Sequence, residues 1–281
     1  MIVVTGATGN VGRALVRALA DKGEDVTATS RGITGEDVPQ GVRHRRADLG
    51  DPAGLAPVLD GADALFLQSG GPDAGRLRPR DILDAAKAGG VERVVLLSSQ
   101  GVETRPRSHS HGVLMRSIED VVRESGLDWT VLRPSGFASN TFGWAESVRT
   151  TRTVRAPFAD TGLPVIDPQD IAEVAAAVLR ENGHAGRVYT LTGPAPITPR
   201  QQAAAIAAAL GEEVRFAEQS GDDARAALLR FLPEPVVETT LAILGTPTEA
   251  ERRPGQDVER ILGRPAGAYG EWARRNVAAF R

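Results

Sequence analysis

The 281-residue sequence contains no cysteine, few aromatic residues and almost no lysine. Without cysteine the chain can form no disulfide, thiolate metal site or cysteine nucleophile. Aromatic residues make up only 4% of the chain, so a local cluster of them is informative. Lysine occurs at Lys22 and Lys87, and arginine carries the other positive charges. We interpret the use of arginine in place of lysine as a coding bias that has no chemical meaning.

The sequence also lacks a strong net charge and a long apolar run. A formal charge of −3 gives no indication of a nucleic-acid partner. No signal-like segment precedes the first apolar run, and no run approaches membrane-spanning length. We therefore expect a cytoplasmic protein, either a monomer or a homodimer, that binds a small-molecule substrate but no nucleic acid and no membrane.

Strands and helices are expected to alternate over the first half of the chain. Apolar runs predict strands at residues 1–5, 26–30, 42–46, 62–67, 93–97 and 129–132. Amphipathic periodicity predicts helices at residues 11–20, 52–59, 80–88 and 113–125. Because the connections are short, the alternation predicts an α/β fold with a doubly wound, Rossmann-like parallel sheet. Ligands of such sheets lie beyond the carboxyl ends of the strands.

The pattern changes after residue 133. Residues 135–164 look irregular, and the expected elements beyond them are helices at 170–180, 199–210, 222–232 and 268–280 and a strand at 188–191. We expect Asp167 and Asp170 to cap the first of these helices. The predicted organisation is a dinucleotide-binding core at residues 1–134 and a smaller, substrate-covering lobe at 135–281. Elements at about residues 165–192 are expected to return to the core.

A glycine-rich loop joins the first strand to the first helix. Strand, glycine loop and helix together hold a dinucleotide pyrophosphate, because free N–H groups and the positive dipole end of the helix face the anion. Gly6 permits the tight turn, Gly9 permits close backbone approach, and Gly12 permits close packing of helix on strand. The alternative is a glycine-rich turn without a ligand. The expected cofactor contacts are Gly6, Thr8, Gly9, Asn10, Val11 and Gly12.

The choice of dinucleotide depends on the residues that follow the second strand. An NAD site usually has a carboxylate there, whereas this chain has Thr29, Ser30 and Arg31. Arg31 could bind a 2′-phosphate, which favours NADPH over NADH, or it could be a solvated loop residue. Asp48 and Leu49 follow the third strand, near the expected adenine, although Asp48 could equally be a turn or cap residue.

The glycine motif at residues 6–12 resembles that of the NmrA-like atypical short-chain dehydrogenase/reductases. Residues 125–134, 137–140 and 167–172 and the region around Phe280 are similar to the same family, and the likeness spans most of the chain. The resemblance implies a Rossmann-like fold and NAD(P)H binding. It leaves activity open, because the family contains quinone, enone and ether reductases as well as non-catalytic NADP sensors.

Many relatives of that type carry a Tyr-x-x-x-Lys pair, with a glutamate four residues after the lysine. Counted back from Glu119, the two positions hold His111 and Met115. The resemblance therefore indicates that this acid–base couple is absent, which disfavours alcohol dehydrogenation and sugar epimerisation. Hydride transfer to a quinone or enone needs less help from an acid.

His111 could give that help by protonating a developing enolate or phenolate. The alternative is that His109 and His111 are exposed loop residues. A His-x-His metal site would need a third ligand, which the sequence does not indicate, so no metal is expected.

The family resemblance also assigns roles after the later strands. Ser99 and Gln100 are expected to polarise the substrate carbonyl, whereas the Ser98 side chain is expected to bond backbone at the strand end. Backbone groups of residues 135–137 are expected near the nicotinamide carboxamide. The further cofactor contacts are Gln68, Ser69, Ser98, Pro134, Ser135, Gly136 and Phe137; the substrate contacts are Asn140, Phe142 and Trp144. The alternative for the aromatic segment is ordinary packing.

Two functions remain open. The first is an NADPH-dependent reductase that transfers hydride to a small conjugated carbonyl compound, a quinone or an enone, with His111 and Ser99 or Gln100 at the product oxygen. The alternative is a non-catalytic regulator that senses NADP(H) and binds a protein partner. An open pocket above the nicotinamide would favour the reductase.

Overall fold

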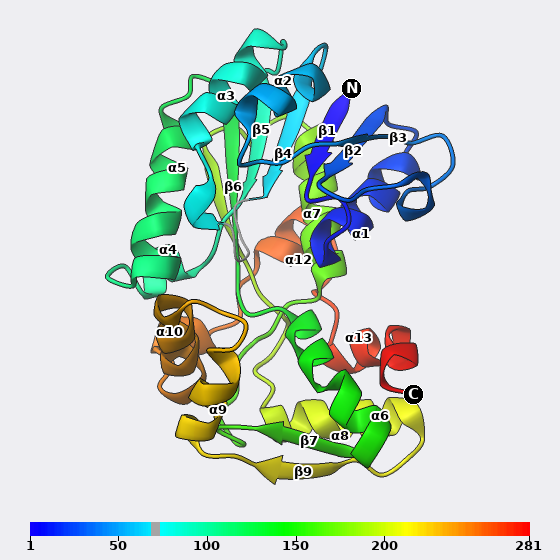
Figure 1. Ribbon diagram of the computed structural model, residues 1–281, viewed down its shortest axis with the longest axis vertical. Helices are drawn as coiled ribbons and strands as arrows, with labels where there is room; N and C mark the ends of the chain where they lie inside the picture. Colours follow the sequence, from blue (N-terminus) through cyan, green and yellow to red (C-terminus); the bar gives the residue numbers. More distant parts are fainter. Residues whose placement is uncertain (69–73) are drawn as a thin grey trace.

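A seven-stranded parallel sheet forms the centre of the computed structural model, which describes residues 1–68 and 74–281. Its strand order is β3-β2-β1-β4-β5-β6-β8, so the expected doubly wound α/β fold is confirmed. A second, two-stranded sheet pairs β7 with β9 at the opposite end of the molecule (Figure 1). The strands are β1 Ile2–Thr5, β2 Val26–Ser30, β3 Arg43–Arg46, β4 Ala64–Gln68, β5 Arg93–Leu97, β6 Asp128–Pro134, β7 Thr153–Ala156, β8 Arg187–Leu191 and β9 Arg215–Glu218.

Helices cover both faces of the large sheet. Helices α1, α7 and α12 pack on one face, and α2, α3 and α5 pack on the other. No helix in the described part of the chain is both long and apolar enough to cross a membrane. The helices are α1 Asn10–Ala20, α2 Pro52–Leu59, α3 Pro79–Ala88, α4 Gly101–Thr104, α5 Met115–Arg123, α6 Ala145–Thr151, α7 Pro168–Arg180, α8 Pro199–Leu210, α9 Gly221–Leu228, α10 Glu234–Gly245, α11 Glu249–Arg252, α12 Asp257–Leu262 and α13 Tyr269–Arg275.

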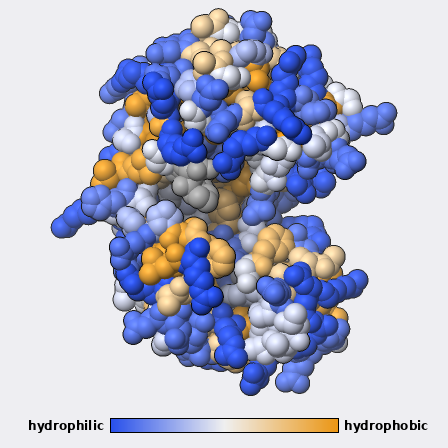
Figure 2. Space-filling view, in the orientation of Figure 1, coloured by the Kyte–Doolittle hydropathy of each residue, from blue (hydrophilic) through white to orange (hydrophobic). Residues whose placement is uncertain are grey.

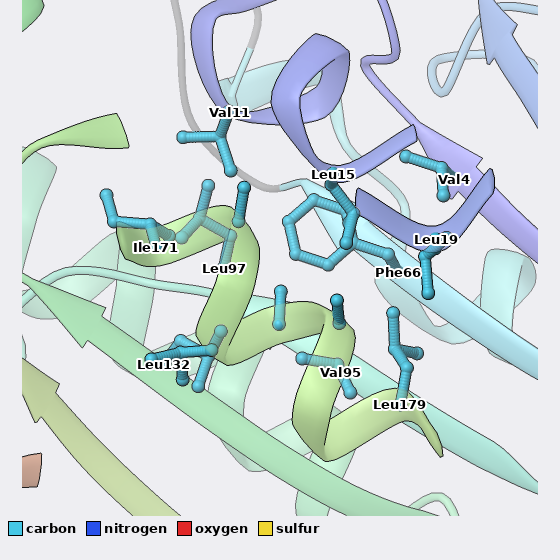
Figure 3. Close-up of a cluster of buried hydrophobic side chains, with 14 of the residues drawn as sticks. Val4, Val11, Leu15, Leu19, Phe66, Val95, Leu97, Leu132, Ile171 and Leu179 are labelled. Atoms are coloured by element: carbon cyan, nitrogen blue, oxygen red, sulfur yellow. The ribbon is translucent and has the colours of Figure 1, made fainter. Parts of the chain in front are cut away.

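The core between the sheet and helices α1 and α7 follows the expected periodicity. Leu15 and Leu19 of α1 are fully buried against Phe66 of β4, and Ile171 and Leu179 of α7 complete the cluster (Figure 3). Burying a side chain of this size contributes about 1.5–3 kcal/mol, so this layer fixes the first helix on the sheet. The glycine loop before α1 is therefore held in a defined position.

Two elements beyond residue 134 belong to the large sheet. Strand β8 pairs with β6, and α7 packs against α1 on the same face. The Asp167 carboxylate accepts the N–H of Gln169, as expected of an N-cap. Asp170 instead accepts the N–H of Gly267 and a bond from Arg264, and burial raises its pKa.

The segment expected to be irregular, residues 135–164, contains regular structure. It holds a 3-10 helix at Ala138–Trp144, helix α6 and strand β7, and helices α10, α11 and α12 and strand β9 were also not expected. Strands β7 and β9 have four residues each and depend on pairing with each other, which no local pattern reveals. The expectation for this segment was therefore wrong in its local structure.

Candidate functional site

A pocket of about 510 Å³ opens at the carboxyl ends of the first four strands. Its position matches the point where the strand order reverses, between β1 and β4, which is where doubly wound sheets bind ligands. The surface is also hollowed between the part that contains the large sheet and the part that contains β7 and β9 (Figure 2). The residues that line the pocket are Thr5, Gly6, Thr8, Gly9, Thr29, Ser30, Arg31, Gly32, Ala47, Asp48, Leu49, Gly50, Leu55, Gln68, Arg76 and Leu77.

Two glycines make the first turn of this site possible. Gly6 has a positive φ of 63°, and a Cβ there would lie 1.8 Å from Oε1 of Gln68. A Cβ on Gly12 would lie 2.2 Å from the carbonyl oxygen of Gly6, so only glycine lets α1 approach the loop this closely. The side chain of Gln68 therefore packs directly against the turn at Gly6.

The residues around this turn fit a bound dinucleotide. Helix α1 begins after Gly9 with no side-chain cap and no acidic residue in its first turn, which leaves N–H groups for an anion. Thr29 is 2% exposed and lines the pocket, and its Oγ1 is the one buried side-chain oxygen or nitrogen without a partner among the described residues. A buried hydroxyl without a partner is costly, so a ligand would satisfy it.

Asn10 and Val11, which were expected to contact the cofactor, have other side-chain partners. The Asn10 amide donates to Oγ of Ser139 at 3.1 Å, which links the glycine loop to the segment after β6. The Val11 side chain points into the core, and only its backbone remains for an anion (Figure 3). Thr8 lines the pocket and donates to Oγ of Ser30 at 3.1 Å.

Two arginines and one aspartate line the end of the pocket beside β2 and β3. Arg31 lies directly after β2, and Arg76, which the sequence analysis missed, comes from the short helix at Ala74–Arg76. Asp48 accepts the N–H of Gly50 at 2.9 Å, so it is at least a turn residue. Ser69, an expected cofactor contact, lies outside the described residues.

The end of β5 is held by a buried ion pair. Ser98 donates its hydroxyl hydrogen to Glu119 at 2.7 Å, so the expectation that this side chain bonds backbone was wrong. Glu119 also accepts two bonds from Arg133, at 2.9 and 2.7 Å, and one from Arg123. Burial opposes its charge, but these bonds hold the pKa of Glu119 below its ordinary value. The pair thereby joins the ends of β5 and β6.

The three expected catalytic residues lie close together after β5. The Oγ of Ser99 accepts the N–H of Gly101, and Gln100 is buried at the start of α4. A Cβ on Gly101 would lie only 2.6 Å from Cβ of His111, so the histidine backbone packs against this turn. His111 itself belongs to a π-helical turn at His109–Leu114, a geometry often found at functional sites. His109 is exposed, whereas His111 is half-buried.

The electrostatic environment of His111 differs from that of an exposed histidine. Burial lowers its pKa, and the nearby carboxylate of Glu251 opposes that shift only in part. Glu251 is fully buried and accepts two bonds from Arg105, at 2.8 and 2.7 Å. Neutral imidazole is therefore the resting form at neutral pH, and its protonated form is a stronger acid than free imidazolium.

Some backbone groups of the segment after β6 already form hydrogen bonds within the protein. The N–H of Ser135 donates to Leu191, and the carbonyl of Gly136 accepts the N–H of Ile166. The N–H of Ser135 is therefore already used, whereas the carbonyl of Gly136 can accept a second bond, and a role of this segment at the carboxamide stays a prediction. Pro134 is buried, and Phe137 is half-buried and pairs with Ile166 through an isolated bridge.

The three expected substrate contacts occupy different environments. Asn140 is exposed and Trp144 is half-buried. Phe142 packs against Trp272 and Phe280, with ring centroids 5.1 and 6.1 Å apart. A substrate role for these residues stays a prediction. Across the described ranges no three His, Asp or Glu side chains are grouped to hold a metal ion.

This fold and pocket define the class of NAD(P)H-binding α/β proteins. A family model described as NAD(P)H-binding matches residues 6–182. The chain belongs to this family, in its NmrA-like atypical short-chain dehydrogenase/reductase branch, as the sequence motifs implied.

Several relatives match this chain over almost their whole length. The chain is 39% identical to a (4-alkanoyl-5-oxo-2,5-dihydrofuran-3-yl)methyl phosphate reductase of Streptomyces griseus subsp. griseus, with 100% of this chain and 99% of the relative covered. It is 30% identical to an NAD(P)H azoreductase of Xenophilus azovorans over 100% and 99% of the two chains. The Escherichia coli NADPH-dependent quinone oxidoreductase in complex with NADPH has a TM-score of 0.80 at 25% identity, over 98% and 99% of the chains.

Proposed function

We propose that this protein is an NADPH-dependent reductase of small conjugated carbonyl compounds, of the enone class. The observation that carries the proposal is the end-to-end similarity to the Streptomyces reductase. The name of that enzyme's substrate describes a dihydrofuranone whose ring C=C bond is conjugated with the lactone carbonyl and the alkanoyl carbonyl. Such a C=C bond accepts hydride at its β-carbon.

The residues after β5 are suited to the second half of that reaction. When bound, NADPH supplies the hydride. Hydride addition at the β-carbon moves the π electrons toward the carbonyl oxygen, which then needs a proton. Protonated His111 can donate that proton, and the Ser99 hydroxyl, next to it, can donate a hydrogen bond to the same oxygen. Met115 and His111, at the positions of the Tyr-x-x-x-Lys pair, support a reaction that begins with an electrophile rather than an alcohol.

Preference for NADPH rests on the pocket beside β2. Two arginines line that end of the pocket, and no carboxylate follows β2 at Ser30–Gly32. An arginine fork binds a 2′-phosphate with two parallel bonds, whereas a 2′-hydroxyl calls for a carboxylate. We also propose that the protein binds a small-molecule substrate and no other class of ligand besides the dinucleotide. We propose further that it is a monomer or a homodimer and that it is cytoplasmic.

The test is to mix the protein with NADPH and a panel of 2-acyl butenolides, other enones, quinones and azo compounds, and to follow loss of the reduced nicotinamide absorbance. We expect the acyl butenolides and enones to give the highest kcat/KM. Arg31→Ala should raise the KM for NADPH about tenfold, a cost of roughly 1.4 kcal/mol, and leave the KM for NADH unchanged. Absence of substrate-dependent oxidation over the whole panel would reject the reductase and favour the NADP(H)-sensing alternative.

A further inference from the structure

The turn that carries His111 is bonded to helix α10 through a group of hydroxyls. Oγ of Ser110 lies 2.8 Å from Nδ1 of His111 and 3.1 Å from the carbonyl oxygen of Pro235. Oγ1 of Thr239 lies 2.7 Å from Oγ of Ser108 and 2.9 Å from the same carbonyl oxygen. Thr239 is 8% exposed, so this contact is sheltered from water.

Chemistry fixes the direction of most of these bonds. A carbonyl oxygen can only accept, so Thr239 donates its single hydroxyl hydrogen to Pro235. Because the Thr239 hydrogen is used in that bond, Ser108 supplies the hydrogen for its 2.7 Å contact with Oγ1 of Thr239, while it accepts the backbone N–H of His111 at 3.1 Å. The bond between Ser110 and the ring of His111 is then the one that decides the position of the ring proton.

The bond count decides the direction of this last bond. Oγ of Ser110 carries one hydrogen and lies near four groups: the carbonyl of Pro235, Nδ1 of His111, Oγ1 of Thr239 at 3.3 Å and Oγ of Ser108 at 3.4 Å. If Ser110 donated to Nδ1, its bonds to Pro235 and Thr239 would be lost. If Nδ1 carries the hydrogen and donates to Ser110, the bond to His111 and a bond to Pro235 or Thr239 form at once. In a half-buried site the arrangement with more satisfied bonds is favoured.

We propose that Ser110 and Thr239 are positioning residues that hold neutral His111 with its proton on Nδ1, so that Nε2 is the atom that takes up and delivers the catalytic proton. The catalytic meaning of this proposal rests on the proposed function, whereas the proton position is a property of the resting protein. Because Nδ1–H keeps its acceptor in both charge states, the ring need not turn between uptake and delivery. In this way helix α10 supports the chemistry from more than 120 residues away in the sequence.

The backbone around His111 holds the ring near these hydroxyls. Ser108 caps the π-helical turn by accepting the N–H of His111. A Cβ on Gly112 would lie 2.1 Å from the carbonyl oxygen of Arg105, so the π-helical turn packs directly against the C-terminal end of α4. With the backbone fixed from both sides, the proton position depends on the hydroxyls of Ser110 and Thr239.

The proton position can be measured by NMR on protein labelled with ¹⁵N-histidine. The chain has four histidines, and loss of one set of signals in His111→Gln assigns the ring. Long-range ¹H–¹⁵N spectra distinguish a protonated Nδ1 from a protonated Nε2. We expect the wild-type ring of His111 to show Nδ1–H above its pKa. We expect Ser110→Ala and Thr239→Val to shift both nitrogen signals toward the other tautomer.

The controls separate positioning from general damage. Thr239→Ser keeps the hydroxyl and should keep the wild-type spectrum, and it serves even if Thr239→Val fails to fold. Ser117→Ala removes an exposed hydroxyl that, within residues 1–68 and 74–281, bonds the carbonyl of Leu114, and it should also leave the His111 signals unchanged. A wild-type ring protonated on Nε2, or unchanged His111 signals in Ser110→Ala, would overturn the proposal.

Kinetics then connect the proton position to the reaction. Ser110→Ala should lower kcat about tenfold, which is less than the 10²–10⁴-fold that a general acid contributes because His111 itself remains, and leave the KM for NADPH unchanged. A lower kcat without a change of tautomer would contradict positioning. Lack of reduction by the wild-type protein would reject the proposed function alone, because the spectra are recorded without substrate.

Discussion

Two buried glutamates, Glu119 and Glu251, lie on either side of the residues that follow β5, and they hold different parts of the molecule. Each accepts two bonds from one arginine, Arg133 or Arg105. Glu119 is 1% exposed and Glu251 is fully buried. Glu119 and its partner are 14 residues apart, whereas Glu251 and its partner are 146 residues apart. The first pair is therefore local to the sheet, and the second joins the sheet region to the C-terminal helices.

The difference concerns what each pair stabilises. Glu119 joins the ends of β5 and β6, the rigid base of the site. Glu251 belongs to helix α11, and its carboxylate lies near the turn that carries His111. Its backbone N–H takes part in a capping box with Thr248. We infer that the first pair maintains the fold, whereas the second maintains the position of an expected catalytic group.

The largest effect is expected from Glu119→Gln. The substitution leaves Arg133, which is 9% exposed, without its buried carboxylate partner, and the exposed carboxylate of Glu103 at 3.3 Å replaces it only weakly. Breaking such a pair costs about 3–5 kcal/mol, so the free energy of unfolding should fall by about 3 kcal/mol in urea titrations. Glu124→Gln is the matched control: this glutamate is exposed and contacts Arg80 at 3.5 Å, so it should cost less than about 0.5 kcal/mol. Equal losses in the two variants would contradict the structural role of Glu119.

Glu251→Gln is expected to cost less, about 1–2 kcal/mol, although its carboxylate is equally buried. The side chain of Arg105 is 20% exposed and still has the carbonyls of Ala242 and Thr246 as acceptors, so its charge is not stranded. Hydrogen exchange should become faster at residues 105–114, where the turn detaches, and stay unchanged at β5. If the loss of stability matches that of Glu119→Gln, the two pairs do not differ as argued above.

The sheet region was predictable because its signals are local. Strand β5 and helix α2 have the expected bounds, and Asp51 caps α2 by accepting the N–H of Gly54. The buried face of α1 was predictable because the helical spacing of its apolar residues is visible in the sequence. Strand β3 has four exposed charged or histidine residues, and it forms at the sheet edge only because β2 pairs with it.

The C-terminal half was less predictable because its order comes from long-range contacts. Strand β7 needs β9, about 60 residues later, and α10 has no single apolar face that marks it as a surface helix. The site shows the same division. The glycine loop and Arg31 were readable, but the Arg105–Glu251 pair and the Ser110–Thr239 contact join distant segments. An exposed arginine in a short helix between strands, such as Arg76, carries no local sign of its role.

A smaller effect is expected from Gly101→Ala, which tests the contact between the turn after β5 and His111. The added Cβ would lie 2.6 Å from Cβ of His111, so the histidine must move. We expect kcat to fall about tenfold, equivalent to roughly 1.4 kcal/mol, with dinucleotide affinity retained, as measured by steady-state kinetics and fluorescence titration. Gly270→Ala, in helix α13 with open space around it, is the matched control and should leave kcat unchanged. An unaltered kcat in the Gly101 variant would separate His111 from the reaction.

The smallest expected effect is a shift in the pH profile of kcat, which compares the two glutamates directly. Because protonated His111 is the proposed acid, the rate should rise as the pH falls through its pKa, which burial places below the ordinary value of about 6.5. Among the described residues, the charged group that acts on the ring is Glu251, which is itself bonded to Arg105. Removing the negative charge in Glu251→Gln lowers the pKa of His111 further. The limb of the pH profile, that is, the pH range over which kcat rises, should therefore move to lower pH by less than about one unit, or 1.4 kcal/mol.

The glutamate of the sheet provides the control for that shift. Glu119 bonds Arg133, Arg123 and Ser98, and it does not contribute to the pKa of His111. Glu119→Gln should therefore lower stability without moving the limb, measured at a temperature where the variant is folded. In His111→Gln the limb should disappear. If both glutamate variants move the limb equally, the shift reflects a general loosening of the fold, and Glu251 has no specific electrostatic effect on His111.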